Sequence, residues 1–178
     1  MDEARLVESA DGGVMPEGEG WFVLNAKETR WIDGAFGAYC NFEGPDIRFS
    51  QVGINLNVLE PGQPMTMYHR EDAQEDFLVV AGECLLIVEG EERPLRRWDL
   101  FHCPAGVSHA IVGAGTGLSL VVAIGARTGE EDDGTLYPVD AAAQRHGAGV
   151  AQETTSVREA YAEHTFDWVP YREGLLPD

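Results

Sequence analysis

The sequence contains little cysteine and no paired cysteine motif. Cys40, Cys84 and Cys103 are its only thiols, and no two of them form a Cys-x-x-Cys pair. An odd count without that pair argues against both a disulfide framework and a structural zinc knuckle. Each cysteine lies in a mostly apolar segment, which is typical of a buried thiol that packs as a small hydrophobe.

Basic residues and long apolar runs are also scarce. Twelve lysines and arginines face 31 acids, which gives a net charge of -19. Such a surface repels phosphate backbones and anionic lipids, so we expect neither nucleic acid nor membrane as a partner. No apolar run approaches the roughly 18 residues of a spanning helix. The acidic N-terminus lacks the pattern of a secretion signal, which predicts a cytoplasmic protein. The acidic run at 130–133 is expected to be a solvated loop.

What the sequence does contain is a series of short apolar stretches from Trp21 onward, separated by Gly, Pro, Asn or Asp. Many short strands at this spacing favour a β-sandwich or barrel over alternating strands and helices. A length of 178 residues suits one domain. We find no internal repeat, so the sequence predicts a single barrel over residues 21–126.

Two stretches predict how their strands are buried. Residues 53–59 alternate apolar side chains with Asn55 and Asn57, the period-two pattern of a half-buried strand. Residues 84–88 are apolar on both faces, so both should be covered. We expect a partner surface or a flanking strand to supply the outer cover, and a homodimer would provide it.

The two ends differ from this strand-rich centre. Residues 1–20 are rich in Gly, Glu and Asp and predict a flexible N-terminal arm. Residues 127–178 predict a C-terminal extension with one or two short helices packed on the barrel. The first helix is expected in the Ala-rich stretch 139–146. The second is expected at 156–164, where a serine and a glutamate three residues later form a capping box.

Two half-motifs stand in the middle of the chain. Glu75 is followed by six residues and Gly82, and His69 stands six residues before Glu75. Residues 104–109 read Pro-Ala-Gly-Val-Ser-His. Over roughly residues 50–125 the chain therefore resembles the cupin superfamily, of the single-domain, conserved-barrel type.

The match to the family pattern is partial. The family's first motif is Gly, five residues, His-x-His, three or four residues, Glu, six residues and Gly. Its second motif is Gly, five residues, Pro-x-Gly, two residues, His, three residues and Asn. Here Glu71 replaces the second histidine, and Gly62 is one residue too far from His69. Trp98 and Gly113 replace the second motif's first Gly and final Asn.

The resemblance implies an all-β cupin or jelly-roll antiparallel β-barrel with an N-terminal arm and short C-terminal helices. It also implies one metal ion inside the barrel, held by His69, Glu71, Glu75 and His109. Imidazole and carboxylate ligands suit Zn²⁺, Fe²⁺, Mn²⁺ or Ni²⁺. Glu71 could instead orient a ligand, act as a catalytic base on the substrate, or belong to a solvated turn.

The spacing itself favours convergence of these side chains. His69 and Glu71 are two residues apart, so on a strand both side chains leave the same face. A turn then leads to a strand on which Glu75 can point inward, and the Pro-Gly turn can return His109 to the same pocket. His102 is expected to pack in the barrel, and His146 and His164 to be exposed on the tail helices.

The resemblance implies a metal-dependent dioxygenase, isomerase or decarboxylase that acts on a small polar or sugar-like molecule. A non-catalytic binding or sensor protein with a degenerate metal site is the main alternative. A structural partner domain with a vestigial pocket is a third.

Overall fold

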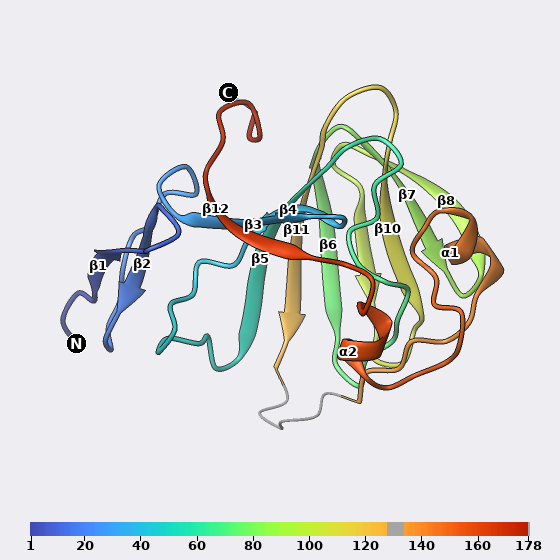
Figure 1. Ribbon diagram of the computed structural model, residues 1–178, viewed down its shortest axis with the longest axis horizontal. Helices are drawn as coiled ribbons and strands as arrows, with labels where there is room; N and C mark the ends of the chain where they lie inside the picture. Colours follow the sequence, from blue (N-terminus) through green and yellow to red (C-terminus); the bar gives the residue numbers. More distant parts are fainter. Residues whose placement is uncertain (128–133, 178) are drawn as a thin grey trace.

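The computed structural model describes residues 1–127 and 134–177, so the acidic run at 130–133 lies outside the described residues. Two antiparallel sheets form the body of the molecule (Figure 1). The larger sheet has the order β12-β3-β4-β5-β11-β6-β9, and the smaller has the order β10-β7-β8. The predicted all-β antiparallel jelly-roll barrel is confirmed.

The strands are short, as their spacing in the sequence predicted. Those of the larger sheet are β3 (Arg30–Gly34), β4 (Gly37–Cys40), β5 (Val52–Leu59), β6 (Glu75–Ala81), β9 (Leu100–Cys103), β11 (Ser119–Ala126) and β12 (Phe166–Pro170). Those of the smaller sheet are β7 (Glu83–Val88), β8 (Glu91–Arg96) and β10 (His109–Ala114).

Strands β6, β7, β10 and β11 contribute the main hydrophobic core. It includes Phe77, Val79, Leu86, Ile111 and Val121, each at most 3% exposed. Burial of these apolar side chains is the main contribution to the stability of the barrel.

The outer face of β7 is covered as predicted, but by the same chain. Leu85 and Ile87 pack with Ala142 and Ala143 of the short helix α1 (Ala141–Arg145). Asp140 caps this helix by accepting a hydrogen bond from the Ala143 amide at 2.8 Å. Strand β7, whose two apolar faces suggested a homodimer, is therefore covered within one chain. The homodimer itself stays a prediction.

The C-terminal extension runs from α1 beside β8, through α2 (Val157–Ala160), to β12 beside β3 (Figure 1). Ser156 caps α2 by accepting a hydrogen bond from the Glu159 amide. The predicted capping box is only half formed, because the Glu159 carboxylate accepts from the Thr154 hydroxyl instead.

The N-terminal segment forms a separate two-stranded sheet. Strand β1 (Arg5–Glu8) pairs antiparallel with β2 (Val14–Glu17), and Figure 1 shows this hairpin at one end of the molecule. The segment predicted as a flexible arm thus contains a hairpin, and its movement stays a prediction. In the described residues, no helix is long and apolar enough to cross a membrane.

Candidate metal centre

Two histidines distant in sequence lie opposite each other on paired backbones. The His69 amide donates to the His109 carbonyl at 3.1 Å, and the His109 amide donates to the His69 carbonyl at 2.8 Å. The turn that precedes His109 is fastened to the first half-motif, because the Gly106 amide donates to the Glu71 carbonyl at 2.7 Å. Gly106 has a φ of +83°, which glycine adopts without strain.

Glu75 brings a carboxylate to this histidine pair from the first position of β6. Its Oε2 lies 3.3 Å from His109 Nε2 and 3.8 Å from His69 Nε2. One ligand atom from each of the three residues lies within 4.8 Å of the others. Three separate elements therefore place two imidazoles and one carboxylate around a single point.

The outer ring nitrogens are held by backbone carbonyls. His69 Nδ1 lies 2.7 Å from the Met67 carbonyl, and His109 Nδ1 lies 3.2 Å from the Val107 carbonyl. A carbonyl can only accept a hydrogen bond, so each Nδ1 carries a proton. In the neutral rings both Nε2 atoms then keep a lone pair on the side of Glu75. Histidines that ligate metals are oriented in this way.

One of these ring nitrogens lacks a partner. His109 is 1% exposed, and its Nε2 makes no hydrogen bond to the described part of the chain. A buried polar atom without a partner is rare and costly. A cation between His109 and Glu75 would satisfy this nitrogen, so the donor set fits a metal ion.

The charges around His69 also favour a cation. Burial acts to lower the pKa of His69, but the hydrogen bond that the protonated ring donates to Glu71, the charges of Glu75 and Glu71, and the Met67 carbonyl outweigh it. The net result is a raised pKa. Cys103 lies close by, with Sγ 3.3 Å from His109 Nδ1. Burial, followed by the charges of Glu75 and Glu71, raises the pKa of the Cys103 thiol to about 12, so it stays protonated at neutral pH.

Glu71 is beside this group but outside it. Its Oε1 lies 3.4 Å from His69 Nε2, and its side chain is 21% exposed. It is not one of the three residues whose ligand atoms cluster. The structure therefore brings all four predicted site residues together, with Glu71 beside the three-residue group.

A pocket of about 830 Å³ is lined by His69, Glu71 and Glu75, whereas His109 lies behind them and does not line it. Its floor includes Asn55 and Asn57, so the polar face of β5 points toward the pocket and not toward solvent. Asn57 Nδ2 and Thr66 Oγ1 are buried, and neither has a hydrogen-bond partner in the described residues. Asn57 and Thr66 both line the pocket, so its lining includes polar side chains.

The C-terminal extension supplies a wall of the pocket that was not predicted from the sequence. Tyr137, Arg158, Tyr161 and His164 all line it. The Tyr161 hydroxyl accepts a hydrogen bond from the Met67 amide at 3.0 Å. Burial raises the pKa of Tyr161 to about 12, so the hydroxyl is neutral.

Three predictions about other histidines were wrong. His146, expected to be exposed, is half-buried, and its Nε2 lies 3.1 Å from Glu92 Oε1. His164 is half-buried, and its ring packs edge-on against Phe36 with centroids 4.8 Å apart. His102 is exposed and not packed in the barrel, because the β6–β9 register puts it opposite Asp76. Its Nδ1 lies 2.7 Å from Asp76 Oδ1, and this contact lowers the pKa of Asp76.

Comparison with known proteins supports the family. A model described as a cupin domain matches residues 55–124. A solved sugar phosphate isomerase of the cupin superfamily from Silicibacter pomeroyi is 26% identical, with 58% of this chain and 71% of that chain covered and a TM-score of 0.47. A cupin 2 conserved barrel protein from Salinispora arenicola is 17% identical, with 61% and 81% covered and a TM-score of 0.45.

A sugar phosphate isomerase candidate from Acidithiobacillus ferrooxidans is 30% identical, with 43% of this chain covered and a TM-score of 0.42. The present chain spans about half of that protein, 51% of its length. No curated protein matches the chain. Residues 55–124 match a cupin domain and lie inside an antiparallel barrel of two sheets, which identifies this part of the chain as a cupin domain.

Proposed function

We propose that the chain is a metal-dependent enzyme that moves a proton on a small polar, sugar-like molecule bound in the barrel pocket. The observation that carries the proposal is the convergence of two Nε2 atoms and one carboxylate beside this pocket. His69, Glu75 and His109 would hold the ion. Their imidazole and carboxylate groups suit Zn²⁺, Fe²⁺, Mn²⁺ or Ni²⁺. When bound, the ion would polarise a carbonyl or hydroxyl group of the substrate.

Glu71 is the residue that we assign to proton transfer. Its carboxylate is part of the pocket wall, beside His69 and open to a bound molecule. A carboxylate in that position can take a proton from one atom of the substrate and return it to another. The fourth-ligand role predicted for Glu71 is the competing assignment.

The polar side chains that line the pocket indicate the chemical class of molecule that it would bind. Asn57 Nδ2 can donate a hydrogen bond, and Thr66 Oγ1 can both donate and accept. Both atoms are buried without partners in the described residues. A molecule with hydroxyl and carbonyl groups suits a lining that includes these amide and hydroxyl side chains better than an apolar ligand does.

The first test is the metal content of the pure protein. We expect about one equivalent of a divalent transition metal in the wild type, since the described residues contain one such donor set. His69→Ala should lose it, whereas His102→Ala, which changes an exposed histidine outside the site, should keep it. Substoichiometric metal that does not rise on adding Fe²⁺, Mn²⁺, Ni²⁺ or Zn²⁺ would contradict the proposal. Thermal stabilisation by a sugar but by no metal would instead indicate the non-catalytic binding protein.

The second test is hydrogen exchange on candidate substrates. Hydroxyaldehydes and hydroxyketones incubated with the metal-loaded protein in D₂O should gain deuterium at carbon, as followed by proton NMR. Glu71→Gln should abolish this exchange and keep the metal. Loss of the metal from Glu71→Gln would show that Glu71 is a ligand.

A further inference from the structure

We propose that the substrate carries an oxyanion, a carboxylate or a phosphate ester, and that Arg158 and His164 of the C-terminal extension bind it. This inference rests on the proposed function, because it concerns the molecule that fills the same pocket. It assigns recognition to a part of the chain that lies outside the matched cupin domain.

Arg158 is the one lysine or arginine among the described residues that line the pocket. No carboxylate forms an ion pair with it in the described residues, although the chain has 31 acids. Five other arginines do pair with a carboxylate: Arg5, Arg96, Arg127, Arg145 and Arg172. Five more have no ion pair within the described residues, but none of these lines the pocket: Arg30, Arg48, Arg70, Arg93 and Arg97. In so acidic a protein, an arginine left unpaired at a pocket is available for a ligand.

The charged side chains around α2 line two different hollows. Arg158 lines the barrel pocket, whereas its neighbours Glu159 and Glu163 line a second hollow, between α2 and the segment that follows α1. The Glu159 carboxylate is also engaged by the Thr154 hydroxyl. Arg158 therefore lines the barrel pocket, whereas Glu159 and Glu163 do not.

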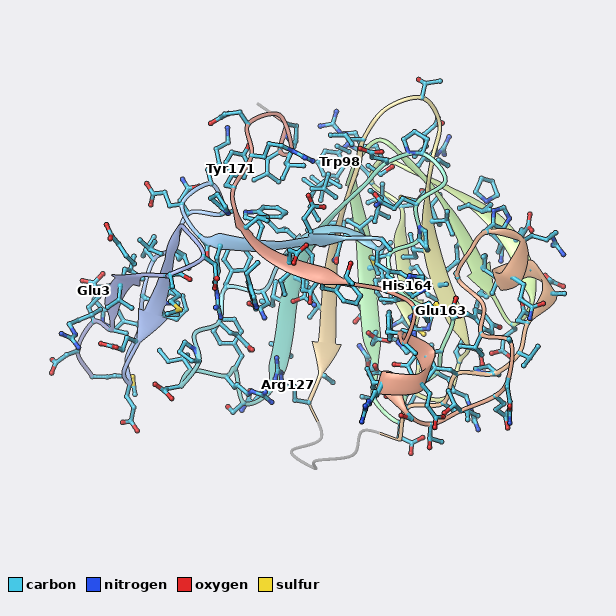
Figure 2. All side chains as sticks on the ribbon, viewed as in Figure 1. Glu3, Trp98, Arg127, Glu163, His164 and Tyr171 are labelled. Carbon is cyan, nitrogen blue, oxygen red and sulfur yellow. The ribbon has the colours of Figure 1, made fainter. Side chains whose placement is uncertain are left out.

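His164 adds a second donor to the same wall. Figure 2 labels it next to Glu163, on the turn between α2 and β12. Its ring is positioned by the edge-on contact with Phe36, and its side chain makes no hydrogen bond to the described residues. An imidazole held in place with its nitrogens unused can donate to an anionic oxygen.

The wall that carries these two residues is fixed to the barrel. Tyr161, between them, accepts the hydrogen bond from the Met67 amide and packs edge-on against Phe36 at 5.0 Å. Strand β12 follows directly and pairs with β3 over five residues. A donor on a fixed support loses less conformational freedom when it binds a ligand.

The chemistry of a guanidinium sets the class of ligand. Its N–H groups form a planar fork that matches the two oxygens of a carboxylate or phosphate. The net charge of -19 repels a small anion in general, so binding one requires a local cation. Arg158 supplies that cation next to the proposed reaction site.

Calorimetric titration with matched ligand pairs tests the inference. The pairs are ribose 5-phosphate against ribose, and gluconate against sorbitol, on metal-loaded protein. We expect one charged member to bind about 10- to 100-fold tighter than its neutral partner, the range of one charge-assisted hydrogen-bond pair. The pair that shows the difference identifies phosphate or carboxylate.

Four variants assign the effect to Arg158 and His164. Arg158→Gln should remove the preference, and Arg158→Lys should keep part of it, because lysine retains the charge but not the fork. Arg93→Gln is the matched control, since Arg93 is an exposed arginine on β8 outside the pocket. It should bind like the wild type. His164→Ala should reduce the preference less than Arg158→Gln does.

Two results would overturn the inference: no preference for either charged ligand in the wild type, or a preference that survives in Arg158→Gln. Metal content measured on the same samples separates this failure from that of the proposed function. Full metal without anion preference removes only the oxyanion site. Anion preference without metal keeps that site and removes the metal-dependent chemistry.

Discussion

The matched barrel region and the C-terminal extension build the same pocket by different means. The barrel supplies His69, Glu75 and His109 from positions fixed by backbone pairing and by a glycine turn. The extension supplies Arg158 and His164 from a short helix and a turn that are held to the barrel by one tyrosine and one strand. Within this fold, the three candidate metal ligands belong to the barrel, whereas Arg158 and His164 belong to a segment packed on its outside.

The barrel and the extension differ most in how deeply their aromatic side chains are buried. Phe77 and Phe166 test this difference. Phe77 in the barrel is 1% exposed, stacks on Phe101 at 5.7 Å and touches the His109 ring at 5.1 Å. Phe77→Ala should lower the free energy of unfolding by about 3–5 kcal/mol, as large core truncations do. Phe166→Ala, on β12 and 40% exposed, should cost less than half of that. Chemical denaturation measures both, and equal losses would contradict the comparison.

For the barrel, the short strands and the convergence of His69 and His109 could be predicted from the sequence. Local spacing determines strand length, and the two half-motifs place His69 and His109 in register because the Pro-Gly turn has few conformations. The direction of β5 could not be predicted in this way. Alternation shows that Asn55 and Asn57 share a face, but it does not show that Leu56 and Val58 pack toward Trp31 on the opposite side.

The extension half was predicted only as short helices packed on the barrel. The path of the extension depends on β12 pairing with β3, more than 130 residues apart, and no local pattern encodes that pairing. The roles of Arg158 and His164 follow from this path alone. A helix of four residues has too few turns for its sequence to show which side faces a pocket.

Two carboxylates four residues apart give the next prediction. Glu75→Gln should weaken metal binding by more than the roughly 10- to 100-fold that follows from losing an outer partner, because it removes a charged ligand. Glu71→Gln should weaken it by no more than that outer-partner range. Competition with a chelating dye gives both affinities. If Glu71→Gln proved as damaging as Glu75→Gln, the ion would have four protein ligands.

The smallest expected effect on stability concerns the hydrogen bond between Tyr161 of the extension and Met67 of the barrel. Tyr161→Phe leaves the Met67 amide without its acceptor and should lower the free energy of unfolding by about 1 kcal/mol. Tyr171→Phe is the matched control in the same extension. The Tyr171 hydroxyl is buried with no partner in the described residues, so its removal should be neutral or slightly stabilising. Denaturation curves of the two variants give the difference directly. If Tyr161→Phe were as stable as Tyr171→Phe, the hydrogen bond to Met67 would not hold the wall, and the positions of Arg158 and His164 would depend on β12 pairing and on the ring contacts with Phe36.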